Sequence, residues 1–455
     1  MELLNLYLTF FKLGIVNFGG GYAMLPLLER ELVNKRGWTT VDDLRDYYAV
    51  GQCTPGAIAV NVSTMIGFKR KGVLGGIVAT LGFVSPAFII IFIIASLLTN
   101  FSDNKYVAHA LAGIRVVVFF LVVSAIMKLF KSSCKDKLST LIAIVVGILA
   151  ISVDAIPLYV YVIVAGILGI VINVIREKKK PVAIEVNDED NLSSAEDDTL
   201  EDTTGNLKTK KKGSILSLII GILCFVLLMV VCTIITITKK DPIFFKLYFQ
   251  FFKVGFLAFG GGLATIPFLQ ELGNATGWFS AEELANMIAV SESTPGAMGI
   301  NMSTYVGYTV INNAFGNYFL SFVGSMISTL GLVTPSIVVI EIVALFLNKF
   351  KTNKWVEYAF YGLRAASIGL MIAAAYSILE ISLMQNSDIV QVFKDTFDGI
   401  HLKTFFPNLG LSLDKIFNWK NIAVGTIIGI TIFKYKKHPI LYIACGAVLG
   451  ILLWM

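Results

Sequence analysis

The chain has 455 residues, and its 37 Lys and Arg against 31 Asp and Glu give a formal net charge of +6 at pH 7. Hydrophobic residues make up 56% of it and charged residues only 15%, against roughly 25% charged residues in an average soluble domain. This balance excludes an ordinary soluble enzyme, a disordered chain and a nucleic-acid-binding protein. The apolar residues fall in long blocks, which indicates an all-α polytopic membrane protein.

The apolar blocks follow one another as six, one and six along the chain. The first six cover 6–28, 47–68, 73–99, 108–130, 138–154 and 156–175. One block, 215–238, follows, and the last six cover 243–269, 286–310, 316–347, 358–384, 421–434 and 438–455. Since about 20 apolar residues cross a bilayer as a helix, each block is a candidate span.

A polar stretch separates the two groups of six blocks. It begins with basic residues, continues through an acidic run and ends with LKTKKK. Low hydropathy and dense charge predict a disordered linker, and its basic ends place the linker and the amino-terminus in the cytoplasm. We therefore divide the chain into a first repeat (1–176), a linker (177–213), a connecting transmembrane helix (214–240) and a second repeat (241–455).

The two groups of six are an internal duplication. FFKLGIVNFGGGYAMLP at 10–26 and FFKVGFLAFGGGLATIP at 251–267 are identical at ten of 17 positions. The match resumes at the GW pairs and TPG segments, and later at TLGFVSP (80–86) with TLGLVTP (329–335) and at GIR (113–115) with GLR (362–364). Six spans followed by a single connecting helix bring the second repeat into the membrane from the opposite face. The sequence thus predicts two inverted-topology repeats of about six helices, a common architecture of secondary transporters.

These motifs together resemble the chromate ion transporter family. The resemblance lies in FGGGxAxxP, in the GW pair, in TPGxxxxNxST and in the two-half plan, and it points to the long, two-domain form. It implies a plasma-membrane protein that exports chromate, and a link to sulfate handling in some members.

Three glycines interrupt the first helix of each repeat, at Gly19, Gly20 and Gly21 and at Gly260, Gly261 and Gly262, which predicts a broken or re-entrant helix there. Glycine loosens a helix and frees backbone N–H groups. Freed amides at the start of a half-helix favour an anion. The alternative is close helix packing through small residues.

The TPG motif is a second expected break, or the tip of a re-entrant hairpin, because proline removes a backbone donor and disfavours helix before it. A threonine precedes each proline, and an asparagine and a serine follow it. These residues are Thr54, Asn61 and Ser63 in the first repeat and Thr294, Asn301 and Ser303 in the second. Hydroxyl and amide donors suit a tetrahedral oxyanion better than a metal ion. The alternative is hydrogen bonding between helices.

Two repeat-related pairs of basic residues lie in or beside apolar blocks, Lys12 with Lys253 and Arg115 with Arg364. A charge at membrane depth costs roughly 2.5–3.5 kcal/mol, so we expect these residues to attract the anion. The alternatives are snorkelling of the lysines and pairing of the arginines with carboxylates. Glu292 and Glu341 stand opposite Gln52 and Phe92 in the other repeat, which makes them candidates for proton coupling.

The function expected from these residues is secondary active export of an oxyanion, chromate by resemblance, driven by the membrane potential, with proton exchange as an option. The alternatives are a sulfate-like anion importer or exchanger, and a non-transporting membrane scaffold. No catalytic, nucleotide or metal-ligand motif is visible, so we expect neither enzyme activity, cofactor nor metal. The expected partners are a small inorganic oxyanion and the lipid bilayer, without nucleic acid, and a homodimer is left open.

Overall fold

A computed structural model describes residues 1–17, 24–100, 104–153, 156–179, 242–347, 353–384, 417–435 and 438–453, and this part of the chain is helical, without a sheet. The first repeat contains α1 (Glu2–Val16), α2 (Leu25–Leu28), η2 (Glu29–Asn34), α3 (Val41–Gln52), α4 (Ile58–Asn100), α5 (Lys105–Ser133), α6 (Lys137–Ser152) and α7 (Leu158–Lys179). The second contains α9 (Ile243–Leu257), η3 (Gly262–Thr265), α10 (Ile266–Thr276), α11 (Ala281–Ser293), α12 (Met298–Phe315), α13 (Tyr318–Leu345), α15 (Lys354–Leu383), α18 (Trp419–Tyr435) and α19 (Pro439–Leu453).

Five of the described helices are long and apolar enough to cross a membrane, namely α4, α5, α7, α13 and α15. Two shorter helices, α6 and α19, are also apolar. Most of the expected linker and the whole connecting helix over 214–240 lie outside the described residues.

The first apolar block is not one continuous helix, because α1 ends at Val16 and α2 begins at Leu25. Arg36, which follows η2, donates to the side chain of Asn5 near the start of α1 at 3.2 Å. Arg36 also lies over the ring of Trp38, and Arg70 lies over the same ring at 4.7 Å. Arg36 therefore lies beside the start of α1, at the end of the molecule that also holds the kink in α4.

α4 is two helices joined at a kink, because Lys71 and Gly72 leave the helical conformation. The part before the kink folds back along the part after it, and Thr64 and Thr80 hydrogen-bond through their hydroxyl groups at 2.6 Å. In the second repeat α12 and α13 form the matching hairpin, where Thr304 and Thr329 bond at 2.8 Å.

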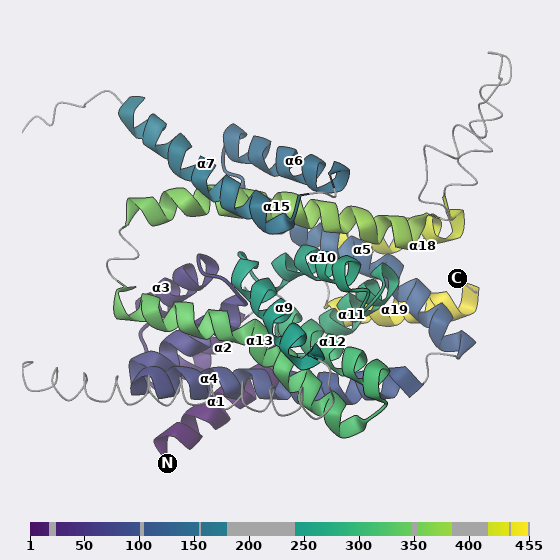
Figure 1. Ribbon diagram of the computed structural model, residues 1–455, viewed down its shortest axis with the longest axis horizontal. Helices are drawn as coiled ribbons and strands as arrows, with labels where there is room; N and C mark the ends of the chain where they lie inside the picture. Colours follow the sequence, from purple (N-terminus) through teal and green to yellow (C-terminus); the bar gives the residue numbers. More distant parts are fainter. Residues whose placement is uncertain are drawn as a thin grey trace, which may run out of the picture.

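The last hairpin of each repeat packs on the other repeat. α6 and α7 lie along α15, and α18 and α19 lie along α5. Figure 1 shows α15 as a long helix across the upper part of the molecule, with α6 and α7 above it and α1, α4 and α13 below. We call α5 and α15, which carry the motif arginines, the arginine helices, and the hairpins on them the swapped hairpins.

Glycines let the swapped hairpins approach closely. A Cβ at Gly362 of α15 would lie 1.7 Å from the carbonyl oxygen of Ala165 in α7. A Cβ at Gly113, the counterpart of Gly362 in α5, would lie 2.1 Å from the carbonyl oxygen of Gly446 in α19. Backbones in such contact are typical of helix packing within membranes. The same contact thus occurs twice with the repeats exchanged, which is the mark of a two-fold relation.

Asp136, between α5 and α6, fixes one end of this arrangement. It caps α6 and accepts hydrogen bonds from Ser139, Arg176 and the Tyr361 hydroxyl of α15. Desolvation acts to raise the pKa of Asp136, but these donors outweigh it and hold the pKa well below its usual value. The carboxylate therefore ties the first repeat to the second arginine helix at neutral pH.

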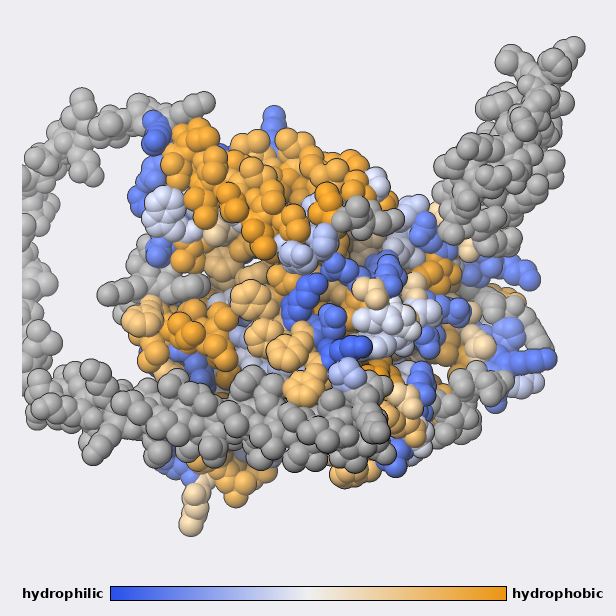
Figure 2. Space-filling view, in the orientation of Figure 1, coloured by the Kyte–Doolittle hydropathy of each residue, from blue (hydrophilic) through white to orange (hydrophobic). Residues whose placement is uncertain are grey.

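The outer faces of α6 and α7 carry exposed apolar side chains, namely Leu141, Ile144, Ile148, Ile163, Ile167 and Val171. Figure 2 shows this surface as a continuous apolar area. Such an area on a protein with several membrane-length helices is suited to contact with lipid.

Candidate functional site

The TPG motif breaks a helix in each repeat. α3 ends at Gln52 and α4 begins at Ile58, while α11 ends at Ser293 and α12 begins at Met298. The glycines of the two motifs, Gly56 and Gly296, have φ values of +95° and +117°. Only glycine adopts such values without strain, so each TPG turn depends on its glycine as well as on its proline.

A buried asparagine holds each turn closed. The amide nitrogen of Asn61 donates to the carbonyl of Pro55 and the hydroxyl of Thr54, both at 3.0 Å, and to the carbonyl of Gly51. Asn301 makes the same three contacts with Pro295, Thr294 and Ser291. Both asparagines are 0% exposed. Their amide nitrogens are thus occupied within the turn in this conformation.

Each turn bonds to the glycine-motif break of the other repeat. The backbone N–H of Gly56 donates to the carbonyl of Ala258 at 2.9 Å, and Pro55 and Phe259 form an antiparallel bridge. The N–H of Gly296 donates to the carbonyl of Asn17 at 2.8 Å, and Asn17 is the counterpart of Ala258. We call the region that holds these two pairs, Gly56 with Ala258 and Gly296 with Asn17, the junction.

The junction is close-packed. A Cβ at Gly56 would lie 1.7 Å from the hydroxyl oxygen of Ser336, and one at Gly296 would lie 2.5 Å from the Cβ of Ala87. Ser336 and Ala87 are counterparts that follow the proline of the TLG motif. The Ser336 hydroxyl also donates to the carbonyl of Pro55 at 3.3 Å. Each TPG glycine therefore fits against a helix of the other repeat.

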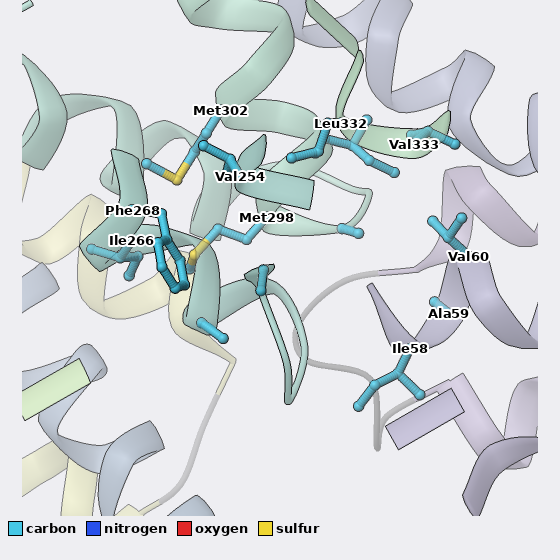
Figure 3. Close-up of a cluster of buried hydrophobic side chains, with 14 of the residues drawn as sticks. Ile58, Ala59, Val60, Val254, Ile266, Phe268, Met298, Met302, Leu332 and Val333 are labelled. Carbon is cyan, nitrogen blue, oxygen red and sulfur yellow. The ribbon is translucent and has the colours of Figure 1, made fainter. Parts of the chain in front are cut away.

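A small enclosed cavity lies at the junction. Gly56, Gly262, Gly299, Thr265 and Ser336 line it, together with the apolar side chains Val60, Ile300, Leu332 and Val333. Figure 3 shows Val60 of the first repeat near Leu332 and Val333 of the second. The cavity offers about 10 Å³, close to the least that holds one water molecule. An ion larger than one water molecule therefore does not fit in this cavity.

The glycine motif of the second repeat borders this cavity. Gly260 and Gly261 have φ values of +104° and +105°, and η3 begins at Gly262 and leads into α10. Among the described residues, no atom lies within 4 Å of a Cβ placed on Gly260. Gly19, Gly20 and Gly21 of the first repeat lie outside the described residues.

The two motif arginines have different partners. Arg364 of α15 donates to the sulfur of Cys53, the residue before the TPG turn of the first repeat. Arg115 of α5 forms an ion pair with Glu282 in the first turn of α11, and its side chain is 13% exposed. Arg364 is thus at the junction, while Arg115 is bound elsewhere.

The motif lysines do not line the cavity. Lys12 and Lys253 are exposed on α1 and α9. The ammonium group of Lys253 lies 4.8 Å from the centre of the Tyr159 ring at the start of α7. Their side chains point to the outer surface or to a neighbouring helix in this conformation.

The two candidate carboxyls occupy different settings. Glu292 is at the end of α11, next to the second TPG turn, where Lys128 of α5 acts on it electrostatically. Glu341 of α13 faces α4, and a Cβ at Gly76 would lie 2.5 Å from its Oε1. That oxygen is buried without a hydrogen-bond partner among the described residues.

Ser63 and Ser303 are buried in α4 and α12, and their hydroxyls donate to Ala59 and Ile300 carbonyls of the same helices. Among described residues, no three His, Cys, Asp or Glu side chains are grouped to hold a metal ion. The sequence prediction did not select Gly56, Gly296, Thr265, Ser336 or Glu282. The two TPG glycines were visible in the repeat, whereas nothing local marks the other three.

Comparison with known proteins identifies the family. The sequence profile described as "Chromate transporter" matches residues 4–170 and 245–451. The chain belongs to the chromate transporter family. It is the long form with two matching regions, and its family consists of membrane transporters rather than enzymes.

The similarity to individual proteins extends over most of the chain. An uncharacterized transporter of Methanocaldococcus jannaschii is 24% identical over 81% of this chain and 83% of its own length. The chromate transport protein of Pseudomonas aeruginosa is 24% identical over 83% of this chain and 81% of its own length. The chromate transport protein of Cupriavidus metallidurans is 22% identical over 67% of this chain and 67% of its own length. No solved structure matches the chain.

Proposed function

We propose that this transporter exports an oxyanion, chromate by its relatives, across the plasma membrane through the junction of two inverted repeats. The single observation that carries the proposal is the reciprocal pairing of broken helices at the centre of the protein, through Gly56 with Ala258 and Gly296 with Asn17. Broken helices at the interface of two repeats are where secondary transporters bind their substrates.

The topology follows from the repeat and from charge. The amino-terminus and the linker are cytoplasmic, because basic residues flank the linker. If the FGGG and TPG segments re-enter in both repeats, each repeat loses the same number of crossings, and the inversion is kept. The two repeats then correspond to residues 1–176 and 241–455. The linker corresponds to 177–213, and the helix that inverts the second repeat corresponds to 214–240.

The anion is bound beside Gly260–Gly262 and, in the first repeat, Gly19–Gly21. Backbone N–H groups of these breaks and the positive ends of the helices that follow attract the negative charge. Arg364 supplies a planar fork of donors at the junction, and Arg115 does so in the opposite repeat. The hydroxyls of Thr54, Thr294, Ser63 and Ser303 and the amides of Asn61 and Asn301 complete the site when the helices separate. Lys12 and Lys253 raise the local anion concentration.

Separation is required because the junction has room for about one water molecule in this conformation. The glycines and apolar side chains of the lining can part without breaking a charged contact, since the lining carries no ionised side chain. The hydrogen bonds between Gly56 and Ala258 and between Ser336 and Pro55 must open.

The membrane potential suffices to drive export. A dianion that leaves a cell with a negative interior gains about 4.6 kcal/mol per 100 mV, which supports a roughly 2000-fold gradient. Proton exchange through Glu292 or Glu341 adds a second driving force. Uptake of a sulfate-like dianion works against the potential and therefore requires such proton coupling. An importer or exchanger of a sulfate-like anion is the second candidate function. Membership of a transporter family argues against the scaffold.

The test is anion flux into proteoliposomes that contain the purified protein, with chromate, sulfate and chloride compared at equal concentration. We expect chromate to move faster than sulfate and chloride to move little. Flux of sulfate equal to that of chromate would support the second candidate, and absence of flux for all three anions would contradict the proposal.

A further inference from the structure

The two motif arginines contact the helix before the TPG turn of the other repeat at different places. In the second repeat, α11 packs along α5 and α19, with Arg115 at its first turn and Lys128 acting on Glu292 at its last turn. In the first repeat, α3 packs mainly against α4 and η2, and Arg364 of α15 reaches Cys53, past the end of α3.

The counterparts of these partners are known from the repeat. Glu282 corresponds to Asp42 in the first turn of α3, and Cys53 corresponds to Ser293 at the end of α11. The two arginines thus contact equivalent helices at positions eleven residues apart. At 1.5 Å per residue this is a displacement of about 16 Å along a helix.

We propose that Glu282 and Asp42 are gating residues, each of which in turn binds the arginine of the other repeat. This inference rests on the proposed transport through the junction. When each repeat adopts the conformation that the other repeat has in the described structure, the Arg115–Glu282 contact is replaced by an Arg364–Asp42 contact. It also moves Arg115 from Glu282 to the TPG turn of the second repeat, beside Ser293. In each state one arginine is at the junction and the other is held at a carboxylate.

The surroundings of the two carboxylates are compatible with this exchange. Glu282 is 61% exposed, so its pair with Arg115 can break without leaving a buried charge. Asp42 is 91% exposed and has only Arg45 of its own helix as a salt-bridge partner among the described residues. A pair between exposed side chains on one helix is weak, and Asp42 is therefore available to Arg364.

The reporter for the exchange is the thiol of Cys53, a half-buried side chain to which Arg364 donates in the described conformation. Cys134, Cys224, Cys232 and Cys445 are replaced by serine in the full-length protein, and the rate at which N-ethylmaleimide alkylates Cys53 is measured in liposomes over a range of pH. The plateau rates of the fully ionised thiol are compared, because the guanidinium of Arg364 itself favours the thiolate that reacts. Glu282→Gln frees Arg115 and favours the exchanged state, so alkylation is expected to quicken. Asp42→Asn removes the destination of Arg364, so alkylation is expected to slow.

Each change is expected to be about two- to five-fold, the effect of losing one partly exposed ion pair. Asp43→Asn, on the same turn of α3, is the matched control and leaves the rate unchanged. Glu282→Asp and Asp42→Glu keep the negative charges, so their alkylation rates are expected to be close to the rate of the parent protein. The proposal would be overturned if Glu282→Gln and Asp42→Asn gave equal alkylation rates, or if both changed the rate in the same direction. It would also be overturned if Asp43→Asn changed the rate as much as Asp42→Asn. Oxyanion flux of the parent protein is measured separately, so a wrong substrate and a wrong gate give different results.

Discussion

The backbone N–H of Gly56 donates to the carbonyl oxygen of Ala258 at 2.9 Å, which joins the TPG turn of the first repeat to the glycine-motif break of the second. Gly296 and Asn17 make the counterpart bond with the repeats exchanged. Each half therefore satisfies the backbone groups that the other half leaves open. Unpaired backbone groups cost several kcal/mol in a membrane, so these bonds stabilise the contact between the two repeats.

Gly56→Ala should disrupt the junction. The new methyl group would meet the Ser336 hydroxyl at 1.7 Å and would force alanine to a φ near +95°. The backbone strain alone costs about 1–3 kcal/mol. The measurement is thermal unfolding in detergent together with anion flux. Gly277→Ala is the control, because its φ is +64° and no atom of the described part of the chain lies within 4 Å of the added Cβ. A Gly56→Ala protein as stable and active as Gly277→Ala would contradict the close packing.

Asn61→Ala and Asn301→Ala should destabilise the protein to a similar degree, because each removes the amide that holds one TPG turn. The loss of a buried hydrogen-bonding group costs about 1–3 kcal/mol. Asn313→Ala, an exposed position in α12, serves as the control in the same unfolding assay. If only one of the two buried asparagines proves important, the turns are not equivalent.

Gly362→Ala should separate α15 from its swapped hairpin, since the added Cβ would lie 1.7 Å from the Ala165 carbonyl oxygen. We expect a lower thermal stability and a loss of transport. Gly166→Ala in α7 is matched in chemistry, but its Cβ would make ordinary contact with Leu363 at 3.4 Å. Equal stability of the two variants would argue against the packing of α7 on the second repeat.

Glu292→Gln should remove the dependence of chromate flux on pH if this carboxyl carries the exchanged proton. Glutamine has similar size and cannot titrate. Flux is measured across the neutral range with the membrane potential held constant, and Glu357→Gln, an exposed position on α15, is the control. An unchanged pH profile in Glu292→Gln would remove this residue from proton coupling and leave Glu341 to be tested in the same way.

The sequence predicts the local features of this fold better than the long-range ones. The duplication and the helix breaks at Pro55 and Pro295 are visible because proline and repeated motifs act locally. The contact of Arg36 with Asn5 is not visible in the sequence, since hydropathy does not show which residues in and beside one apolar block lie next to each other. The contacts of the junction and of the swapped hairpins join residues more than 200 positions apart. Such pairings depend on tertiary packing, which no local pattern records.

In the candidate site, too, the sequence predicts local features better than long-range contacts. Arg115 and Arg364 stand out because a charge within an apolar block is costly. Their unequal partners, Glu282 and Cys53, cannot be read from two nearly identical motifs. The difference arises because one sequence plan adopts two conformations in the two repeats.

The most direct test of the central claim is chromate flux in proteoliposomes when the imposed membrane potential is reversed, with the unmodified protein compared to Arg364→Gln and Arg364→Lys. We predict that the flux changes direction with the potential, that Arg364→Gln abolishes it and that Arg364→Lys keeps part of it. Potential-independent flux, or a rate in Arg364→Gln equal to that of the unmodified protein, would contradict an oxyanion path through the junction.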